Sequence, residues 1–114
     1  MGKQKTIIIA EIGVNHNGSI TLAKKLIKQL SKLDINAVKI QSYSTDNLVS
    51  KKSILADYQK DDNLEYSNQY EMLKKYELSK KQIIKLSKFS KECGISFMSS
   101  VFSIQDFKKL SSLS

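Results

Sequence analysis

Three short apolar segments alternate with longer amphipathic ones, and this alternation constrains the fold more than any other feature of the chain. The apolar segments lie at about 6–12, 36–41 and 95–100 and have the length of strands. The amphipathic segments, with apolar residues three and four positions apart, lie at about 19–33, 66–76, 79–93 and from 103 onward. Strands and helices in alternation are typical of a parallel sheet, so we expect an α/β fold.

Residues that favour helix ends support these boundaries. Capping residues are expected at Ser19, at Ser79 with Gln82 in a capping box, and at Ser103 with Asp106. Gly94 is expected to end the third helix. The apolar stripes of the first and third helices are predicted to contain Leu22, Leu26, Ile27, Leu30 and Leu33, and Ile83, Leu86, Phe89 and Cys93. The long connection at 42–65 shows only one further signal, a possible short helix near 54–58.

All 19 basic residues are lysines, and they give the chain a net charge of +8. Positive charge is typical of nucleic-acid-binding proteins, but arginine, which is preferred for bidentate contacts with bases and phosphates, is absent. The lysines are also spread over the helical segments. We therefore expect no nucleic-acid partner, and keep a small basic module for an acidic partner or nucleic acid as the alternative.

Nothing in the sequence indicates a membrane or export. No apolar run approaches the roughly 20 residues of a membrane helix, and no small-residue cleavage site follows the start. The single cysteine, Cys93, cannot form an internal disulfide and is expected to be a core residue. We expect a cytoplasmic protein with no membrane partner.

Lys39 is a charged residue in a strand that otherwise appears buried. Side chains alternate between the faces of a strand, so Val38 and Ile40 share one face, and Lys39 and Gln41 share the other. A buried ammonium is costly unless it is paired. Glu11, at the end of the first strand, is the expected partner. The alternative for Lys39 is an exposed position on an edge strand, and for Glu11 a purely structural ion pair.

Polar residues gather where the three strands end, which is where the chemistry of parallel α/β proteins takes place. They are Glu11, Asn15, His16 and Asn17, then Lys39, Gln41 and Ser42, then Ser99 and Ser100, followed by Phe102. This set suits a polyhydroxylated or phosphorylated small molecule better than a hydrophobic ligand. His16 could ligate a metal, but a loop hydrogen bond is favoured.

Six segments, in the same order along the chain, resemble the sialic acid synthases, the phosphoenolpyruvate-dependent N-acetylneuraminate, legionaminate and pseudaminate synthases. They are AEIGVNHNG at 10–18, AVKIQS at 37–42, NLVS at 47–50, ADYQ at 56–59, QYEMLKK at 69–75 and ELS at 77–79. The resemblance implies a (β/α)8 TIM barrel followed by an antifreeze-like domain. Since such a barrel needs about 250 residues, residues 1–114 are expected to supply its first three βα units, truncated, without the antifreeze-like domain.

The resemblance also implies a reaction, in which phosphoenolpyruvate condenses with an N-acyl-mannosamine-type sugar and phosphate is lost. A divalent metal, Mn or Mg, would polarise the sugar aldehyde, with ligands that are not in this chain. The family is homodimeric at full length. We expect a transferase that forms a C–C bond, and expect the 114-residue chain by itself to be inactive.

Five residues match functional positions of the family. Glu11 matches a catalytic, sugar-contacting carboxylate, Lys39 and Gln41 a substrate-binding pair, Ser100 a phosphate-contacting threonine, and Phe102 an aromatic residue of the site wall. The usual Ser-Thr-Pro-Phe is replaced here by Ser-Ser-Val-Phe at 99–102, which keeps a hydroxyl but removes the fixed φ of proline. A remnant that does not fold alone is a further alternative.

Overall fold

The structure is a computed structural model that describes residues 5–48 and 63–111, with the backbone alone at 63–68. Its elements are β1 (Ile9–Gly13), α1 (Ile20–Ser31), β2 (Ala37–Ser42), α2 (Thr45–Leu48), α4 (Asn63–Tyr76), α5 (Lys80–Glu92), β3 (Ser96–Val101) and α6 (Ile104–Ser111). The expected short helix at 54–58 lies outside the described residues.

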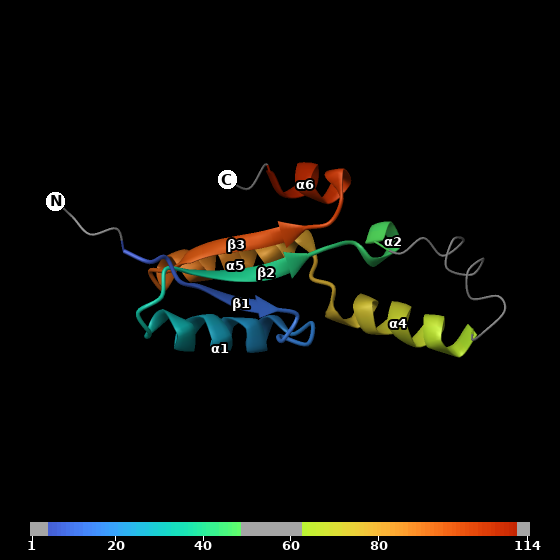
Figure 1. Cartoon of the computed structure of the whole chain (residues 1–114), viewed down its shortest axis with the longest axis horizontal. Coiled ribbons are helices and arrows are strands. Elements are labelled where there is room, and N and C mark those ends of the chain that lie inside the picture. Colours follow the sequence, from blue (N-terminus) through green and yellow to red (C-terminus); the bar gives the residue numbers. More distant parts are fainter. Residues whose placement is uncertain (1–4, 49–62, 112–114) are drawn as a thin grey trace.

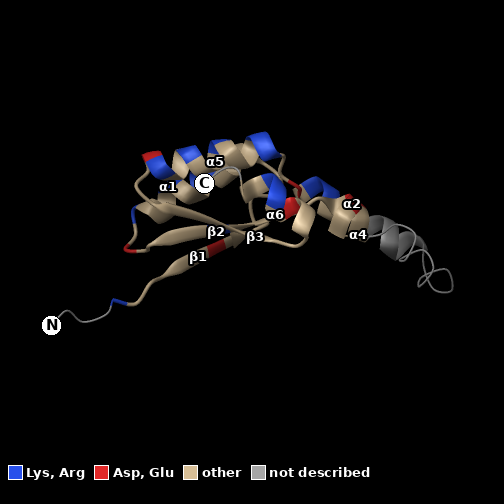
Figure 2. Ribbon diagram, turned by 90° about the horizontal axis from the view of Figure 1, so that it is seen from above, with Lys and Arg blue, Asp and Glu red and all other residues tan. Residues whose placement is uncertain are grey.

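The three strands form one parallel sheet in the order β1-β2-β3. Helices α1 and α5 lie side by side over one face of this sheet, and α4 extends beyond the carboxyl ends of the strands (Figure 1). Viewed from above, the opposite face carries no helix in the described part of the chain (Figure 2). The expected α/β fold with a parallel sheet is confirmed, and β2 is its central strand.

The core lies between the sheet and the two helices. Val38 and Ile40 of β2 are fully buried, as are Ile27 of α1 and Leu86 of α5. Each such aliphatic side chain contributes about 1.5–3 kcal/mol by leaving water. Cys93 packs at the border of this core, as expected for a small apolar residue.

The predicted helix caps are present. The Ser19 side chain accepts a hydrogen bond from Leu22 N–H, and the capping box of Ser79 and Gln82 has both of its bonds. The Ser103 hydroxyl accepts from Asp106 N–H at 3.0 Å, which begins α6. Gly94 follows the last turn of α5 with φ +78°, the left-handed conformation that ends helices.

Three expectations about the elements were wrong. Leu33 does not join the apolar stripe, because α1 ends at Ser31 and the side chain is 60% exposed. The first strand begins at Ile9 rather than near 6, because Ile8 N–H bonds to the Asn36 side chain at 2.8 Å instead of entering a regular ladder. The short helix α2 was missed inside the connection after the second strand.

Candidate functional site

The uncovered face of the sheet brings four of the predicted site residues together. Glu11 lies opposite Lys39 in the β1–β2 register, and Gln41 lies opposite Ser100 in the β2–β3 register. Side chains of paired residues in parallel strands point to the same face. The four residues therefore form two neighbouring polar rows near the carboxyl ends of the strands, and Met98 completes the first row.

Glu11 and Lys39 form the predicted ion pair. Lys39 Nζ lies 3.0 Å from Glu11 Oε2, and the two side chains are 35% and 44% exposed. Lys39 is therefore neither buried nor on an edge strand, because it stands on the central strand and faces the side that no helix covers. An ion pair exposed to this degree adds about 0–1 kcal/mol to stability, so it gives little structural reason for this charge to be here.

Gly13 gives β1 the left-handed backbone turn beside which Glu11 and Gln41 converge. The β1–β2 register shifts between Glu11 and Gly13, and Gly13 has φ +58°. A Cβ atom at Gly13 would lie 3.4 Å from Glu11 Oε1 and 3.9 Å from Gln41 Nε2. The carboxylate and the amide thus lie within ordinary contact distance of the same point beside Gly13. We did not predict this role, for which a glycine directly after a strand is only a weak signal.

Phe102, predicted to belong to the site wall, follows β3 and contacts a residue that the sequence did not single out. The ring of Phe102, 49% exposed, meets the buried ring of Tyr43 edge to face, with centroids 6.5 Å apart. The Tyr43 hydroxyl donates to Leu73 O at 2.7 Å. Burial, followed by the electrostatic effects of Glu77 and of Tyr76, raises the pKa of Tyr43 to about 12, so this hydroxyl stays protonated.

Two of the residues at the strand ends point away from the site. Ser42 alternates with Val38 and Ile40 toward the helix layer, and its Oγ lies 2.5 Å from Ser99 Oγ. Ser100, one position later, is the β3 hydroxyl that shares a face with Gln41. Asn15 and Asn17 are exposed residues of the turn between β1 and α1.

His16 is a structural residue of the same turn rather than part of the uncovered face. It is fully buried, and its Nδ1 accepts a hydrogen bond from Gly18 N–H at 2.9 Å. Burial lowers the pKa of His16, and the nearby Gly13 backbone only partly opposes this shift. The imidazole is therefore neutral, with its proton on Nε2. The loop hydrogen bond that we favoured over a metal-ligating role is confirmed.

The residues present do not fit a metal centre. Within 5–48 and 63–111, no group of three or more His, Cys, Asp or Glu side chains could hold a metal ion. Glu11 is paired with Lys39, and His16 Nδ1 accepts from Gly18 N–H, while no described group is hydrogen-bonded to the buried His16 Nε2. No catalytic step can therefore be assigned to a metal on these residues.

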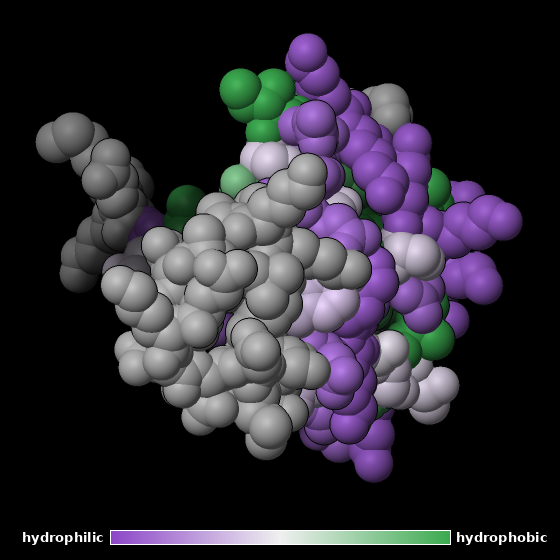
Figure 3. Space-filling model, turned by 90° about the vertical axis from the view of Figure 1, so that its right-hand side faces the viewer, coloured by the Kyte–Doolittle hydropathy of each residue, from purple (hydrophilic) through white to green (hydrophobic). Residues whose placement is uncertain are grey.

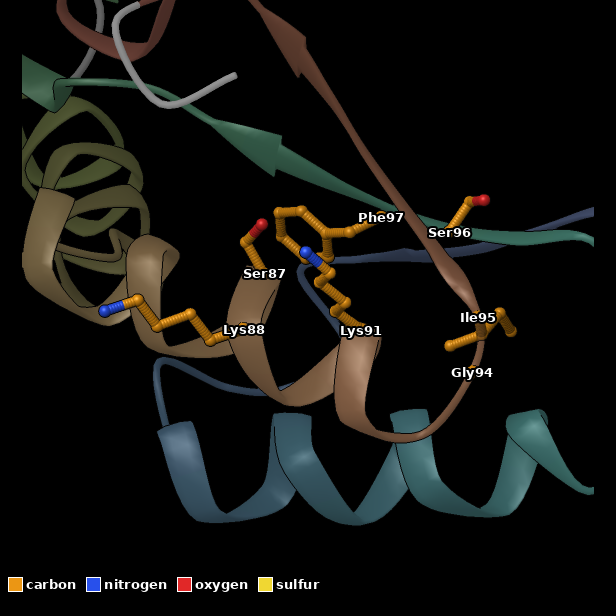
Figure 4. Close-up of a pocket in the computed structure, with 7 residues that line it drawn as sticks. All are labelled: Ser87, Lys88, Lys91, Gly94, Ile95, Ser96 and Phe97. Atoms are coloured by element: carbon orange, nitrogen blue, oxygen red, sulfur yellow. The ribbon is translucent and has the colours of Figure 1, made fainter.

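A cavity of about 670 Å³ lies elsewhere, between the end of α5 and the start of β3 (Figure 4). Its lining includes Lys88, Lys91 and Phe97, but the Lys88 side chain points away from the other lining residues (Figure 4). This cavity is at the amino end of β3, whereas Ser100 is near the carboxyl end. Seen from the carboxyl ends of the strands, the visible described surface is mainly hydrophilic (Figure 3).

A polar cluster at the carboxyl ends of parallel strands is typical of α/β proteins that bind small polar molecules there. Residues 26–114 match the NeuB family. The chain belongs to this family. The resemblance to sialic acid synthases is thereby confirmed.

Curated relatives and solved structures agree with this assignment. The chain is 46% identical to the N,N'-diacetyllegionaminic acid synthase of Legionella pneumophila over 93% of its own length and 30% of that protein. It is 39% identical to the enzyme of the same name from Campylobacter jejuni, over 96% of the chain and 33% of that protein.

Among solved structures, the N-acetylneuraminic acid (sialic acid) synthetase of Leptospira borgpetersenii, in complex with citrate, superposes with a TM-score of 0.74 at 26% identity. That likeness covers 98% of this chain and 34% of that one. The chain thus spans about a third of the length of the relatives that it matches. In the part that the structure describes, no helix is both long enough and apolar enough to cross a membrane.

Proposed function

We propose that this chain is part of an enzyme that joins phosphoenolpyruvate to an N-acyl-mannosamine-type sugar. The proposal is carried by one observation: a NeuB-family chain places a lysine, a carboxylate and an amide together on the uncovered face of its sheet. The names of the relatives support a nine-carbon sugar acid as the product. The homodimer, the antifreeze-like domain and the cytoplasmic location stay predictions.

In the proposed reaction, the terminal carbon of phosphoenolpyruvate forms a bond with the aldehyde carbon of the sugar. Water adds to the neighbouring enol carbon, and inorganic phosphate leaves. A divalent metal would polarise the aldehyde, with ligands from outside the described residues.

Lys39 would offset the negative charge of phosphoenolpyruvate. Its ammonium group is on the central strand and is partly exposed. A bound anion could therefore contact this group while the ion pair with Glu11 stays in place. Gln41 offers an amide beside the same carboxylate. Glu11 would accept hydrogen bonds from sugar hydroxyl groups, and Ser100 would donate to phosphate from the next row.

A lysine-to-alanine pair tests the proposal. In a full-length relative, or in the intact protein that contains this chain, Lys39→Ala should lower kcat/KM for phosphoenolpyruvate by about 100-fold, because a charge-assisted contact is worth about 1.5–3 kcal/mol. Release of phosphate in the presence of N-acetylmannosamine or its 2,4-diacetamido analogue provides the assay. Lys28→Ala, on the exposed side of α1, is the matched control and should behave as wild type.

Unchanged kinetics for Lys39→Ala would leave Lys39 with a structural role only. An intact wild-type protein that releases no phosphate with any such sugar would refute the proposed function itself. We expect the 114-residue chain to be inactive by itself.

The alternative function, a basic binding module, draws on the distribution of lysines. Three lysines lie in α1 and five in α5, so the positive charge gathers over the helix layer, away from the proposed site (Figure 2). Titration with duplex DNA at two salt concentrations separates the two functions. Tight binding that weakens steeply with salt would favour the module.

A further inference from the structure

The loop that follows β2 is fastened to the start of α6 by one carboxylate. Asp106 Oδ1 accepts from the Ser44 hydroxyl at 2.8 Å, and its Oδ2 accepts from Ser44 N–H at 3.3 Å. Asp106 lies in the first turn of α6 and is only 5% exposed. The N–H and the hydroxyl of Ser44 thus both donate to the buried carboxylate of Asp106, which lies 62 positions away in the sequence.

This use of Asp106 differs from its expected role as a capping residue. Ser103 caps α6 by accepting from the backbone N–H of Asp106, which leaves the Asp106 side chain available. In a reciprocal capping box the side chain at this position would return to the N-cap backbone. Here both carboxylate oxygens reach across to the neighbouring loop instead.

The bond to Ser44 continues the connection between β2 and β3 beyond the end of the sheet. The ladder between these strands ends at the pair Ser42 and Val101. The next residues, Tyr43 and Phe102, meet edge to face, and the link from Ser44 to Asp106 follows them. The aromatic contact is therefore held from both sides, by the ladder before it and by Asp106 after it.

A second carboxylate holds the other side of the same loop. Thr45 N–H donates to Glu77 Oε1 at 2.6 Å, and the Tyr43 hydroxyl donates to Leu73 O. These bonds tie the loop to α4 and its end, whereas the bonds from Ser44 to Asp106 tie it to α6. Removing Asp106 would therefore loosen the contact of Tyr43 with Phe102 on its far side from the ladder, while the bonds from the loop to α4 remain.

We propose that Asp106 is a positioning residue that fixes Tyr43 against Phe102 and so sets one wall of the substrate site. This inference rests on the proposed function, because the wall matters only if a substrate binds beside it. We give Asp106 no part in the chemistry, since its carboxylate is buried and both of its oxygens accept from Ser44.

Hydrogen–deuterium exchange of the intact protein tests the positioning independently of activity. Asp106→Ala should speed exchange of the amides at 43–48 by about tenfold and leave those of β1 unchanged, because protection is lost only where the bond to Ser44 is lost. Asp106→Asn keeps one acceptor oxygen, so its exchange rate at 43–48 should lie between those of the wild type and Asp106→Ala. Asp34→Asn removes an exposed carboxylate near the amino end of the sheet and is the matched control.

Kinetics of the same variants then test the effect on the site. Asp106→Ala should lower kcat/KM per folded molecule by about tenfold, since small displacements of positioning groups reduce rates strongly. Partial recovery in Asp106→Asn is expected. If Asp106→Ala does not fold, Asp106→Asn carries both measurements.

The outcomes are distinct. Unchanged exchange at 43–48 would overturn the positioning role, and faster exchange with unchanged kcat/KM would overturn its link to the site. If the intact wild-type protein has no synthase activity, the proposed function fails. In that case Asp106 cannot set a wall of that substrate site either, while the exchange data still show whether Asp106 orders the loop.

Discussion

At the scale of single residues, His16 couples the turn after β1 to pH. Its Nδ1 must be unprotonated to accept from Gly18 N–H, and burial lowers its pKa below the usual value. The unfolded chain, with a histidine pKa of about 6.5, therefore binds this proton at a higher pH than the folded chain does. Stability contributed by neutral His16 is complete above about pH 6.5 and is lost as the pH falls below it, by at most about 1.4 kcal/mol per pH unit.

His16→Gln isolates this effect. Urea unfolding of the intact protein at pH 7.5, 6.5 and 5.5 should show a loss of stability in wild type that is smaller in the variant, because glutamine cannot titrate. Carboxylates, with pKa values of about 4, contribute little in this window. Equal pH dependence in both proteins would show that His16 is not the group responsible.

The residues of the site also show what the sequence could predict. Glu11 and Lys39 were paired correctly because opposite charges at the ends of neighbouring strands have few other partners. The alternation of side chains along a strand also predicts that Ser42 faces the helices, since it lies an even number of positions from Val38 and Ile40. The contact of Tyr43 with Phe102 joins residues far apart in the chain, and no local pattern contains it.

At the scale of elements, two glycines in the left-handed conformation differ only in their surroundings. Gly18 has φ +74° and Gly94 has φ +78°. A Cβ at Gly18 would lie 2.1 Å from the carbonyl oxygen of Lys75, whereas a Cβ at Gly94 meets nothing within 4 Å. Gly18 therefore brings the turn before α1 into direct contact with the end of α4.

Alanine at each position separates backbone strain from this contact. Gly94→Ala should cost only the strain, about 1–2 kcal/mol. Gly18→Ala should cost at least twice as much, since either the turn or the end of α4 must move. Free energies of unfolding from urea titrations provide the measurement, and equal losses in the two variants would contradict the close packing of the turn against α4.

The elements that were predicted correctly are those with local causes. Helices α1 and α5 begin at side chains that cap their own first turn, and Gly94 ends α5 by its own conformation. Helix α2 was missed because its support comes from a distance, with Thr45 N–H bonded to Glu77. The bulge at Gly13 likewise depends on pairing with β2 and has no signature in β1 alone.

At the scale of the whole molecule, the sheet has two outer edges, along β1 and along β3, that no described strand covers. Apolar side chains are exposed near both edges, with Ile7 at 71% just before β1, Ile9 at 43% in β1, and Met98 at 42% in β3. A further space of about 320 Å³ between β1 and α1 is lined mainly by apolar side chains such as Leu26 and Leu30. Parallel sheets are normally covered on both faces, and barrels leave no edges.

These edges predict that stability depends on further βα units. Measured by circular dichroism, the 114-residue chain alone should melt without cooperativity or self-associate, because its exposed edges and apolar surface are unpaired. Adding the rest of the Legionella pneumophila relative, as a second chain, should produce a cooperative melt. The matched control is the same second chain shortened by its last βα unit. This shorter chain would leave the edge along β1 open, so the melt should be less cooperative. The opposite result would be a monomeric chain that melts cooperatively alone, with a melt that neither second chain alters. It would show that three βα units are a sufficient folding unit.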